Sequence, residues 1–167
     1  MPNNIRNPKV FIDIFSKIDS DKYHLYFAGS TDYEKLLSEA AANCNRIHLL
    51  GIIDHSMAED MMKEADFLLN IGNSLSYMVP SKIFEYISYG KRIISTYRID
   101  DDPCIPYLKK YPSSLLINEH EDCALSARRI VEFFESSPNS CELDQAKFYK
   151  NTPIALYNSV NTLFDNR

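Results

Sequence analysis

Short apolar runs recur along the chain, and each ends at a glycine or a polar turn. The apolar residues within a run are continuous rather than alternating. This pattern is typical of strands that are covered on both faces, as in a parallel sheet. The predicted strands are His24–Ala28, Ile47–Leu50, Phe67–Ile71, Ile93–Thr96 and Leu115–Ile117.

Stretches with helical spacing separate these runs. Thr31 with Glu34, and Ser56 with Glu59, have the spacing of a capping box, so each pair predicts the start of a helix. The other predicted helices are 8–18, 80–89, 121–135 and 152–164. Because strand and helix alternate, we expect an α/β fold, a Rossmann-like doubly wound parallel sheet with helices on both faces.

The first predicted element is the helix 8–18, whereas an open α/β domain usually starts with a strand that lies in the middle of its sheet. We therefore expect that a strand is missing. The length of 167 residues suits one domain with its own core. Residues 1–167 are accordingly expected to form a single domain, a fragment of a longer protein.

Composition narrows the class of protein. Hydrophobic residues make up 45% of the chain and charged residues 25%, as in a soluble globular domain. A formal net charge of -5 argues against nucleic acid as a partner, because such binding needs clustered Lys and Arg. Cys44, Cys104, Cys123 and Cys141 form no CxxC pair, so neither a zinc site nor a disulfide framework is indicated. With no signal peptide or membrane-spanning run, we expect a cytoplasmic protein, with contact at the inner face of the membrane left open.

Three of the four glycines, Gly29, Gly51 and Gly72, stand just past the carboxyl ends of predicted strands. In an open α/β sheet, ligands bind at this edge, where loops and helix N-termini converge. The glycines therefore mark a candidate crevice. Ordinary strand-to-helix turns are the alternative for each of them.

The helix predicted at 80–89 carries the strongest local signal. It opens with Pro80 after a polar loop and closes at Gly90, and its first turn should present backbone N–H groups to a phosphate. Lys82 and Glu85 are neighbours on this helix. The Glu85 carboxylate suits a ribose diol, while Lys82 or the Ser81 hydroxyl suits phosphate oxygens. A plain Lys–Glu pair without function is the alternative.

The run from Pro80 to Tyr86, followed by Gly90-Lys91 and Ile93-Ile94, resembles a variant of the signature of group 1 glycosyltransferases, also called family GT4. Upstream agreement comes from Phe27–Ser30, Arg46–Ile53 and Met62–Asn70. The resemblance is to the C-terminal, donor-binding domain of this GT-B family, and it covers roughly residues 4 to 136. It implies a metal-independent, hexosyltransferase-type enzyme that takes a nucleotide-diphosphate sugar as donor and no further cofactor.

The resemblance also implies roles for individual residues. Glu85 would bind the ribose, Arg6 the diphosphate, and the turn from Ser76 to Ser81 the diphosphate and sugar. The full set of donor-binding candidates is Arg6, Gly29, Ser30, Gly51, Ile52, Ile53, Tyr77, Met78, Val79, Ser81, Lys82 and Glu85. Gly51, Ile52 and Ile53 fall where the family places the base. Catalytic residues are unknown, because the acceptor-binding domain that would supply the base is absent, and the isolated chain is expected to be inactive.

One position departs from the family. Many members carry a second glutamate eight residues before the ribose-binding one, and Tyr77 stands there in this chain. A non-catalytic nucleotide-binding module, or pseudo-transferase, is therefore a second hypothesis. A third hypothesis is a metal-dependent GT-A transferase with Asp100-Asp101-Asp102 as its cation site. The alternative interpretation of this run is an acidic, solvated loop without a cation. The sequence does not indicate the nucleotide base, the sugar or the stereochemistry of transfer. Nor does it identify the acceptor, for instance a polysaccharide or glycolipid precursor.

Overall fold

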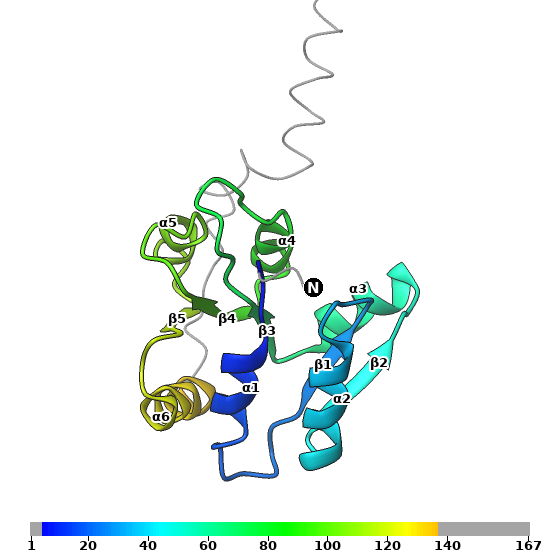
Figure 1. Cartoon of the computed structure of the whole chain (residues 1–167). Coiled ribbons are helices and arrows are strands. Elements are labelled where there is room, and N and C mark those ends of the chain that lie inside the picture. The colour runs from blue at the N-terminus through cyan, green and yellow to red at the C-terminus, as the bar shows by residue number, and fades with distance from the viewer. Residues whose placement is uncertain (1–4, 137–167) are drawn as a thin grey trace, which may run out of the picture.

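The computed structural model describes residues 5–136, and they form an α/β structure in which every strand pairing is parallel (Figure 1). All five predicted strands are confirmed, and each observed end lies within one residue of the predicted end. Their bounds are β1 Leu25–Ala28, β2 Ile47–Gly51, β3 Phe67–Asn70, β4 Arg92–Tyr97 and β5 Ser114–Asn118. The helix predicted at 152–164, and Cys141, lie outside the described residues.

The helices follow the predicted order, with one addition. They are α1 Lys9–Phe15, α2 Glu34–Asn43, α3 His55–Glu64, α4 Lys82–Ser88, α5 Ile105–Leu108 and α6 Cys123–Glu135. The short α5 was not predicted, because four residues with a proline near the start leave no helical periodicity to read. Among the described residues, no helix is long and apolar enough to cross a membrane.

Both predicted capping boxes are wrong. The hydroxyl of Thr31 accepts a hydrogen bond from the N–H of Tyr33 at 3.2 Å, in a turn that ends before α2 begins. Ser56 lies inside the first turn of α3, because Asp54 occupies the extended position that precedes the helix. Neither helix has a side-chain cap. The spacing of a capping box thus occurs in both sequences without its geometry.

The strands form two sheets rather than one. β1 pairs with β2, and β3, β4 and β5 follow one another in the second sheet. The expected doubly wound single sheet is therefore present only in part. Its α/β class and parallel pairing are observed, but no strand among residues 5–136 joins β1 to β3.

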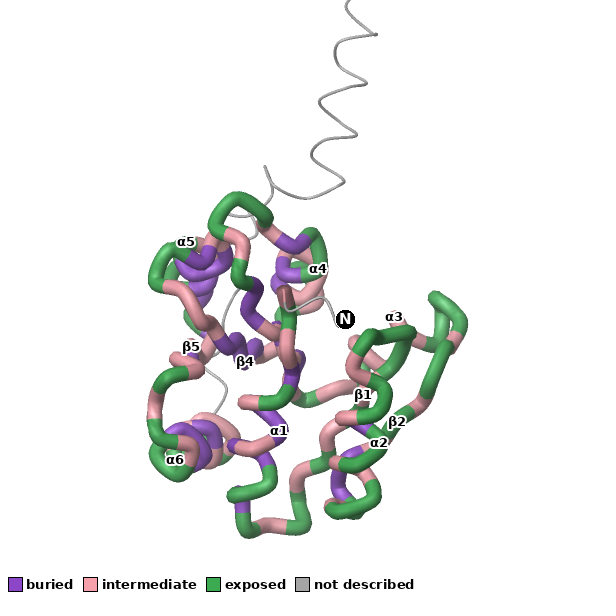
Figure 2. The backbone as a smooth tube through the Cα atoms, viewed as in Figure 1, coloured by how far each residue is buried: buried purple, intermediate pink, exposed green. Residues whose placement is uncertain are grey.

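Helices cover the two faces of the strands with separate cores. One cluster of buried residues comes mainly from α1, α2 and α6, and it includes Ile47 of β2, Ile94 of β4 and Ile117 of β5. The other cluster comes from α4 and α5 and includes Ile93 of β4. Ile93 and Ile94 point to opposite faces, as neighbours in a strand must. Figure 2 shows the buried segments concentrated around β4, while α3 and β2 are largely exposed.

Gly72 stands where β3 ends and its chain passes close to β4. A Cβ atom at this position would lie 2.4 Å from the carbonyl oxygen of Thr96 and 2.8 Å from the Cα of Tyr97. The Gly72 N–H also donates to the Thr96 hydroxyl at 3.1 Å. Since both obstructing atoms belong to the backbone, only glycine fits without moving β4.

Gly72→Ala should therefore lower the free energy of unfolding by about 3 kcal/mol, the upper range for overpacking. Gly51→Ala is the matched control, because Gly51 has a positive φ of 66° but nothing within 4 Å of the added Cβ. Its cost should be about 1 kcal/mol, from backbone strain alone. Urea unfolding of both variants measures the difference, and equal losses would contradict the close approach.

Candidate functional site

A hollow of about 380 Å³ lies at the carboxyl edge of β1, where the chain leading into α1 also arrives. Its lining includes Ile5 and Arg6 before α1, Ser30 and Tyr33 after β1, and Met78 from the loop after β3. Three predicted donor-site residues, Arg6, Ser30 and Met78, are thus brought together from segments far apart in sequence. The volume is within the range of small-molecule sites.

Asn73 organises the loop that carries Met78 to this hollow. Its side-chain amide donates to the Met78 carbonyl at 2.8 Å, and its side-chain oxygen accepts from the N–H of Leu75 at 2.6 Å. The following residue, Ser74, donates its N–H to the carbonyl of Ile5 at 3.0 Å. The buried Asn73 therefore ties the loop after β3 to itself, and Ser74 ties it to the chain before α1.

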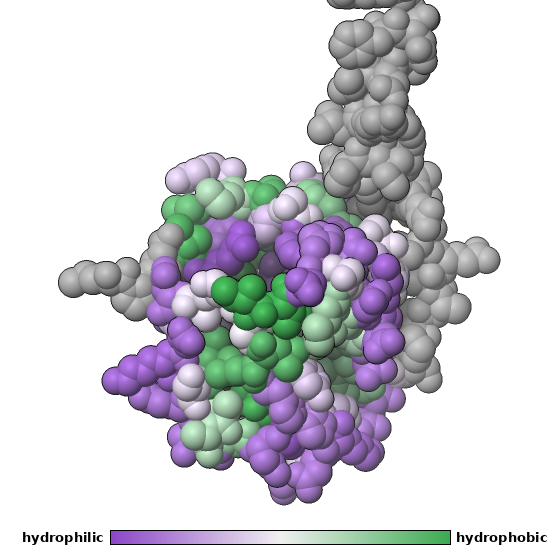
Figure 3. All heavy atoms as spheres, turned by 90° about the vertical axis from the view of Figure 1, so that its right-hand side faces the viewer, coloured by the Kyte–Doolittle hydropathy of each residue, from purple (hydrophilic) through white to green (hydrophobic). Residues whose placement is uncertain are grey.

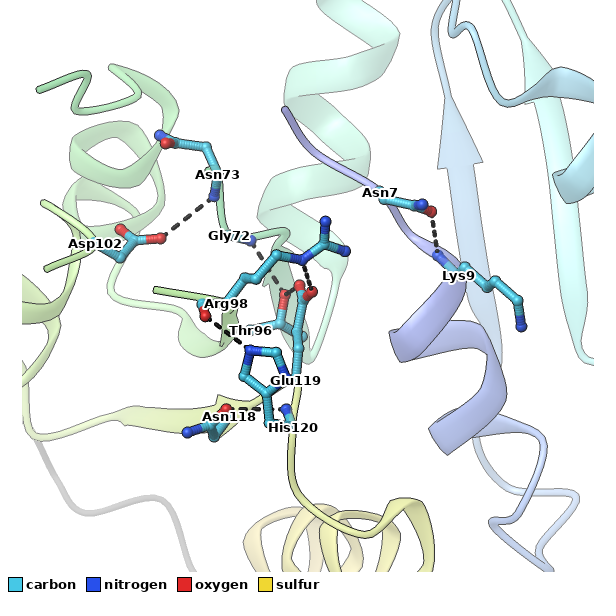
Figure 4. Close-up of polar contacts among 10 residues, drawn as sticks. All are labelled: Asn7, Lys9, Gly72, Asn73, Thr96, Arg98, Asp102, Asn118, Glu119 and His120. Atoms are coloured by element: carbon cyan, nitrogen blue, oxygen red, sulfur yellow. Dashed lines mark hydrogen bonds and ion pairs between the residues drawn. The ribbon is translucent and has the colours of Figure 1, made fainter. Parts of the chain in front are cut away.

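Asp102 holds the same loop from the opposite side (Figure 4). Its carboxylate accepts the N–H of Asn73 at 3.3 Å and the N–H of Cys104 at 2.8 Å. Asp102 is buried, whereas Asp100 and Asp101 are exposed. The three carboxylates of this acidic run thus do not converge, which removes the support for a GT-A type cation site. Within residues 5–136, no group of three or more His, Cys, Asp and Glu side chains could hold a metal ion.

Cys104 lies beside Asp102 in the core. Burial, followed by the nearby Asp102 carboxylate, raises the pKa of the Cys104 thiol to about 12. At neutral pH the thiol is protonated and does not act as a nucleophile.

α4 begins two residues later than predicted. The N–H groups of Ile83 and Phe84 bond to the carbonyls of Pro80 and Ser81 at 3.2 and 3.1 Å. The sequence predicted that N–H groups of this first turn would bind phosphate. Ile83 and Phe84 instead donate theirs within the tight turn itself. Gly90 ends the helix with a positive φ of 66°, as predicted.

Lys82 and Glu85 form an ion pair on α4, with 3.3 Å between the Nζ and Oε2 atoms. Glu85 also accepts from the Tyr89 hydroxyl at 3.4 Å, and the Lys82 Nζ lies 3.8 Å from the sulfur of Met62 on α3. This side of α4 therefore faces α3. The Glu85 side chain is 29% exposed, so it remains accessible to a ligand.

Charges from two segments of the chain act on Tyr86 of α4. Burial raises the pKa of its hydroxyl, the Glu85 charge adds to that rise, and the Arg6 charge opposes it. Both charges therefore act on the same phenol.

Other predicted site residues do not line the hollow. Gly51 ends β2, Ile52 and Ile53 follow it on the way to α3, and Ile52 is 83% exposed. Tyr77 is 79% exposed beside Met78, while Gly29 turns the chain with a φ of 100° directly before Ser30. Ser81 is exposed and Val79 half-buried. Of the predicted donor-site residues, only Arg6, Ser30 and Met78 line the hollow.

The side of the molecule formed by β2 and α3 carries an apolar area (Figure 3). Exposed large hydrophobic residues there are Leu49 of β2, Ile52 after it, and Met57 of α3. α3 contributes no buried residue of its own. The loop expected to lie against a nucleotide base is therefore apolar and solvent-accessible.

A polar network not found by the sequence analysis lies at the carboxyl ends of β4 and β5 (Figure 4). Glu119, with a side chain only 3% exposed, accepts from the Thr96 hydroxyl at 2.9 Å and from Arg98 Nε at 3.0 Å. His120 contacts the Arg98 carbonyl at 3.1 Å. Since Thr96 also binds the Gly72 N–H, this network fixes the start of the loop after β3.

Comparison with known protein families and with curated proteins finds no match for this chain.

Replacing Asp102 tests how the loop is held. Asp102→Ala leaves the N–H groups of Asn73 and Cys104 without their carboxylate, so the free energy of unfolding should fall by about 3 kcal/mol. Asp100→Ala, an exposed residue of the same run, should change it by less than about 0.5 kcal/mol. Thermal and urea unfolding measure both, and equal effects would refute this role for Asp102.

Proposed function

We propose that this chain is the donor-binding domain of a metal-independent GT-B glycosyltransferase of the group 1, GT4 type. The observation that carries the proposal is the hollow at the carboxyl edge of β1, where Arg6, Ser30 and Met78 meet. A guanidinium and a hydroxyl beside one hollow suit the oxygens of a diphosphate.

The chemistry divides among three regions. Arg6 supplies the positive charge for the diphosphate, and as a guanidinium it can bind phosphate oxygens in pairs. Glu85 accepts hydrogen bonds from the ribose diol in place of its present contacts with Lys82 and Tyr89. The exposed Ile52 offers an apolar surface to the base. The sugar extends toward the loop of Tyr77 and Met78.

A pseudo-transferase is the second candidate, and Tyr77 favours it. This residue replaces the glutamate that many family members direct to the donor sugar, and its side chain is 79% exposed. Calorimetric titration with UDP, GDP and their sugars separates the hypotheses. Tighter binding of a nucleotide sugar than of its nucleotide supports a transferase domain, whereas binding of neither excludes both.

Catalysis would require the acceptor-binding domain of a longer parent protein. We propose no catalytic residue in residues 5–136, and we expect the isolated chain to bind donor without transferring sugar. The parent would act in the cytoplasm, at the inner face of the membrane if its acceptor is a glycolipid precursor.

Glu85→Ala should weaken nucleotide binding about tenfold to a hundredfold. The expected loss corresponds to charge-assisted hydrogen bonds worth about 1.5 to 3 kcal/mol. The melting temperature without ligand should change little, because the Lys82–Glu85 pair is partly exposed and contributes little to stability. Titration calorimetry and thermal unfolding give the two readouts.

Glu39→Ala is the matched control, since Glu39 forms a comparable exposed pair with Lys35 on α2. It should leave nucleotide affinity unchanged. A 2',3'-dideoxynucleotide should bind the unmodified chain as weakly as it binds Glu85→Ala, because both changes delete the same contact. Normal nucleotide affinity in folded Glu85→Ala would remove the ribose assignment.

Nucleotide binding should survive removal of metal ions. Arg6 can neutralise part of the diphosphate charge, and Asp102 is engaged with backbone N–H groups. Addition of EDTA should therefore change the Kd less than about twofold, measured by titration calorimetry. A strict requirement for Mn²⁺ or Mg²⁺ that is lost in Asp100→Asn would overturn the metal-independent mechanism.

A further inference from the structure

Two histidines and a tyrosine form an aromatic cluster on β1 and β2, the paired strands that stand side by side in Figure 1. His24 directly precedes β1, Tyr26 belongs to β1, and His48 of β2 is the partner of Tyr26 in the register. The His48 ring stacks on Tyr26 with 4.5 Å between centroids, and on His24 with 5.1 Å. All three rings therefore lie on one face of this two-stranded sheet.

This face is opposite to the one that packs on the core. Side chains alternate between the two faces of a strand. Leu25 and Phe27 of β1, and Ile47 of β2, pack in the cluster that includes α1 and α2. The residues between them point the other way. His24 and Tyr26 are accordingly exposed and His48 is half-buried, so an ion in solution reaches the cluster.

The two imidazole rings face each other through one nitrogen each. His24 Nδ1 and His48 Nε2 lie 2.8 Å apart. A hydrogen bond between two imidazole nitrogens uses a single hydrogen, so at least one of the facing atoms presents a lone pair. Among residues 5–136, neither ring makes another hydrogen bond. Both rings are therefore available to a ligand that is stronger than their mutual contact.

The separation of these two nitrogens matches that of two ligands on one metal ion. With metal–nitrogen bonds of about 2.0 Å, ligands at right angles lie about 2.8 Å apart, whereas tetrahedral ligands lie about 3.3 Å apart. The observed distance corresponds to the right-angled arrangement. Square-planar or tetragonal coordination by imidazole nitrogen is typical of Cu²⁺ and Ni²⁺.

We propose that His24 and His48 form a binding site for one divalent transition-metal ion, Cu²⁺ above all. His24 Nδ1 and His48 Nε2 supply two adjacent ligands, and water completes the coordination. The ring that now donates the shared hydrogen carries it on its other nitrogen once the metal is bound, so both facing lone pairs turn to the ion. Neither histidine lines the hollow, and the inference does not depend on the proposed function.

Stacking on Tyr26 prepares His48 for this role. A side chain that is already packed loses little rotamer freedom when it binds a ligand. The two strands fix the spacing of the histidines, so rotation of the rings is the one adjustment that the metal requires. Within residues 5–136, no third His, Cys, Asp or Glu joins the pair. The affinity should therefore exceed that of a single histidine, and the ion keeps positions open to water.

Titration of the full chain with CuCl₂ tests the site by calorimetry. One Cu²⁺ should bind per chain, and Zn²⁺ should bind more weakly because it prefers tetrahedral ligands. His24→Phe and His48→Phe keep a ring in the stack but remove the ligand nitrogen. Each should weaken Cu²⁺ binding at least about tenfold, since loss of even an indirect partner of a metal ligand has an effect of that size.

His55→Phe is the matched control. His55 is the first residue of α3, and its side chain is 84% exposed, with Glu59 as its neighbour. This variant should leave the Kd for Cu²⁺ unchanged. Equal losses in all three variants, or no loss in His24→Phe and His48→Phe, would overturn the proposal, because the metal would then bind elsewhere.

Two measurements on the unmodified chain cover the case in which a variant does not fold. Cu²⁺ added below one equivalent should broaden the NMR signals of the His24 and His48 rings together, before those of His55 and His120. Electron paramagnetic resonance should show coupling of Cu²⁺ to two nitrogens. Broadening of His24 alone, or one ion shared by a dimer in sedimentation, would contradict a two-histidine site within one chain. Nucleotide affinity is not a readout, so failure here is distinct from failure of the proposed function.

Discussion

Packing of α1 against both sheets is the interaction on which the rest of the structure depends. No hydrogen-bonded ladder joins the two sheets within residues 5–136, so their relative position depends on side-chain packing. Phe11, Ile12, Ile14 and Phe15 of α1 are all buried in the cluster that also includes Ile47 and Ile117. Each buried apolar side chain contributes about 2 kcal/mol, so these four residues of α1 stabilise the contact between the two sheets.

The geometry of the candidate site depends on the packing of α1 against both sheets. The chain before α1 supplies Arg6, β1 supplies Ser30, and the loop after β3 supplies Met78. These segments belong to different sheets, so a shift of α1 would separate them. The contact between Ile5 and Ser74 is the one backbone hydrogen bond described between the chain before α1 and the loop after β3, and it lies at the rim of the hollow.

The sequence predicted the strands well and the loops poorly, for a physical reason. A strand covered on both faces must be apolar throughout, so Ile93 and Ile94 indicate β4 without knowledge of its neighbours. The resemblance predicts Arg6 and Ser30 as donor-binding residues, and both line the hollow. Asn73 was not predicted, and Asp102 was predicted only as part of a cation site or solvated loop, because a polar residue in a loop looks the same in sequence whether it is solvated or buried. The two residues lie 29 positions apart in sequence, and only the tertiary fold brings them together.

The burial of Asp102 also narrows the chemistry that this edge can perform. The Asp102 carboxylate is buried, and it holds the loop after β3 by accepting the backbone N–H groups of Asn73 and Cys104. It is therefore withdrawn from cation binding, although its neighbours Asp100 and Asp101 remain exposed. The positive charge at the hollow comes instead from Arg6, a group that needs no metal and cannot be deprotonated in a protein. The acidic run that suggested a metal-dependent transferase thus holds the loop after β3 through Asp102, and this loop carries Met78 to the hollow.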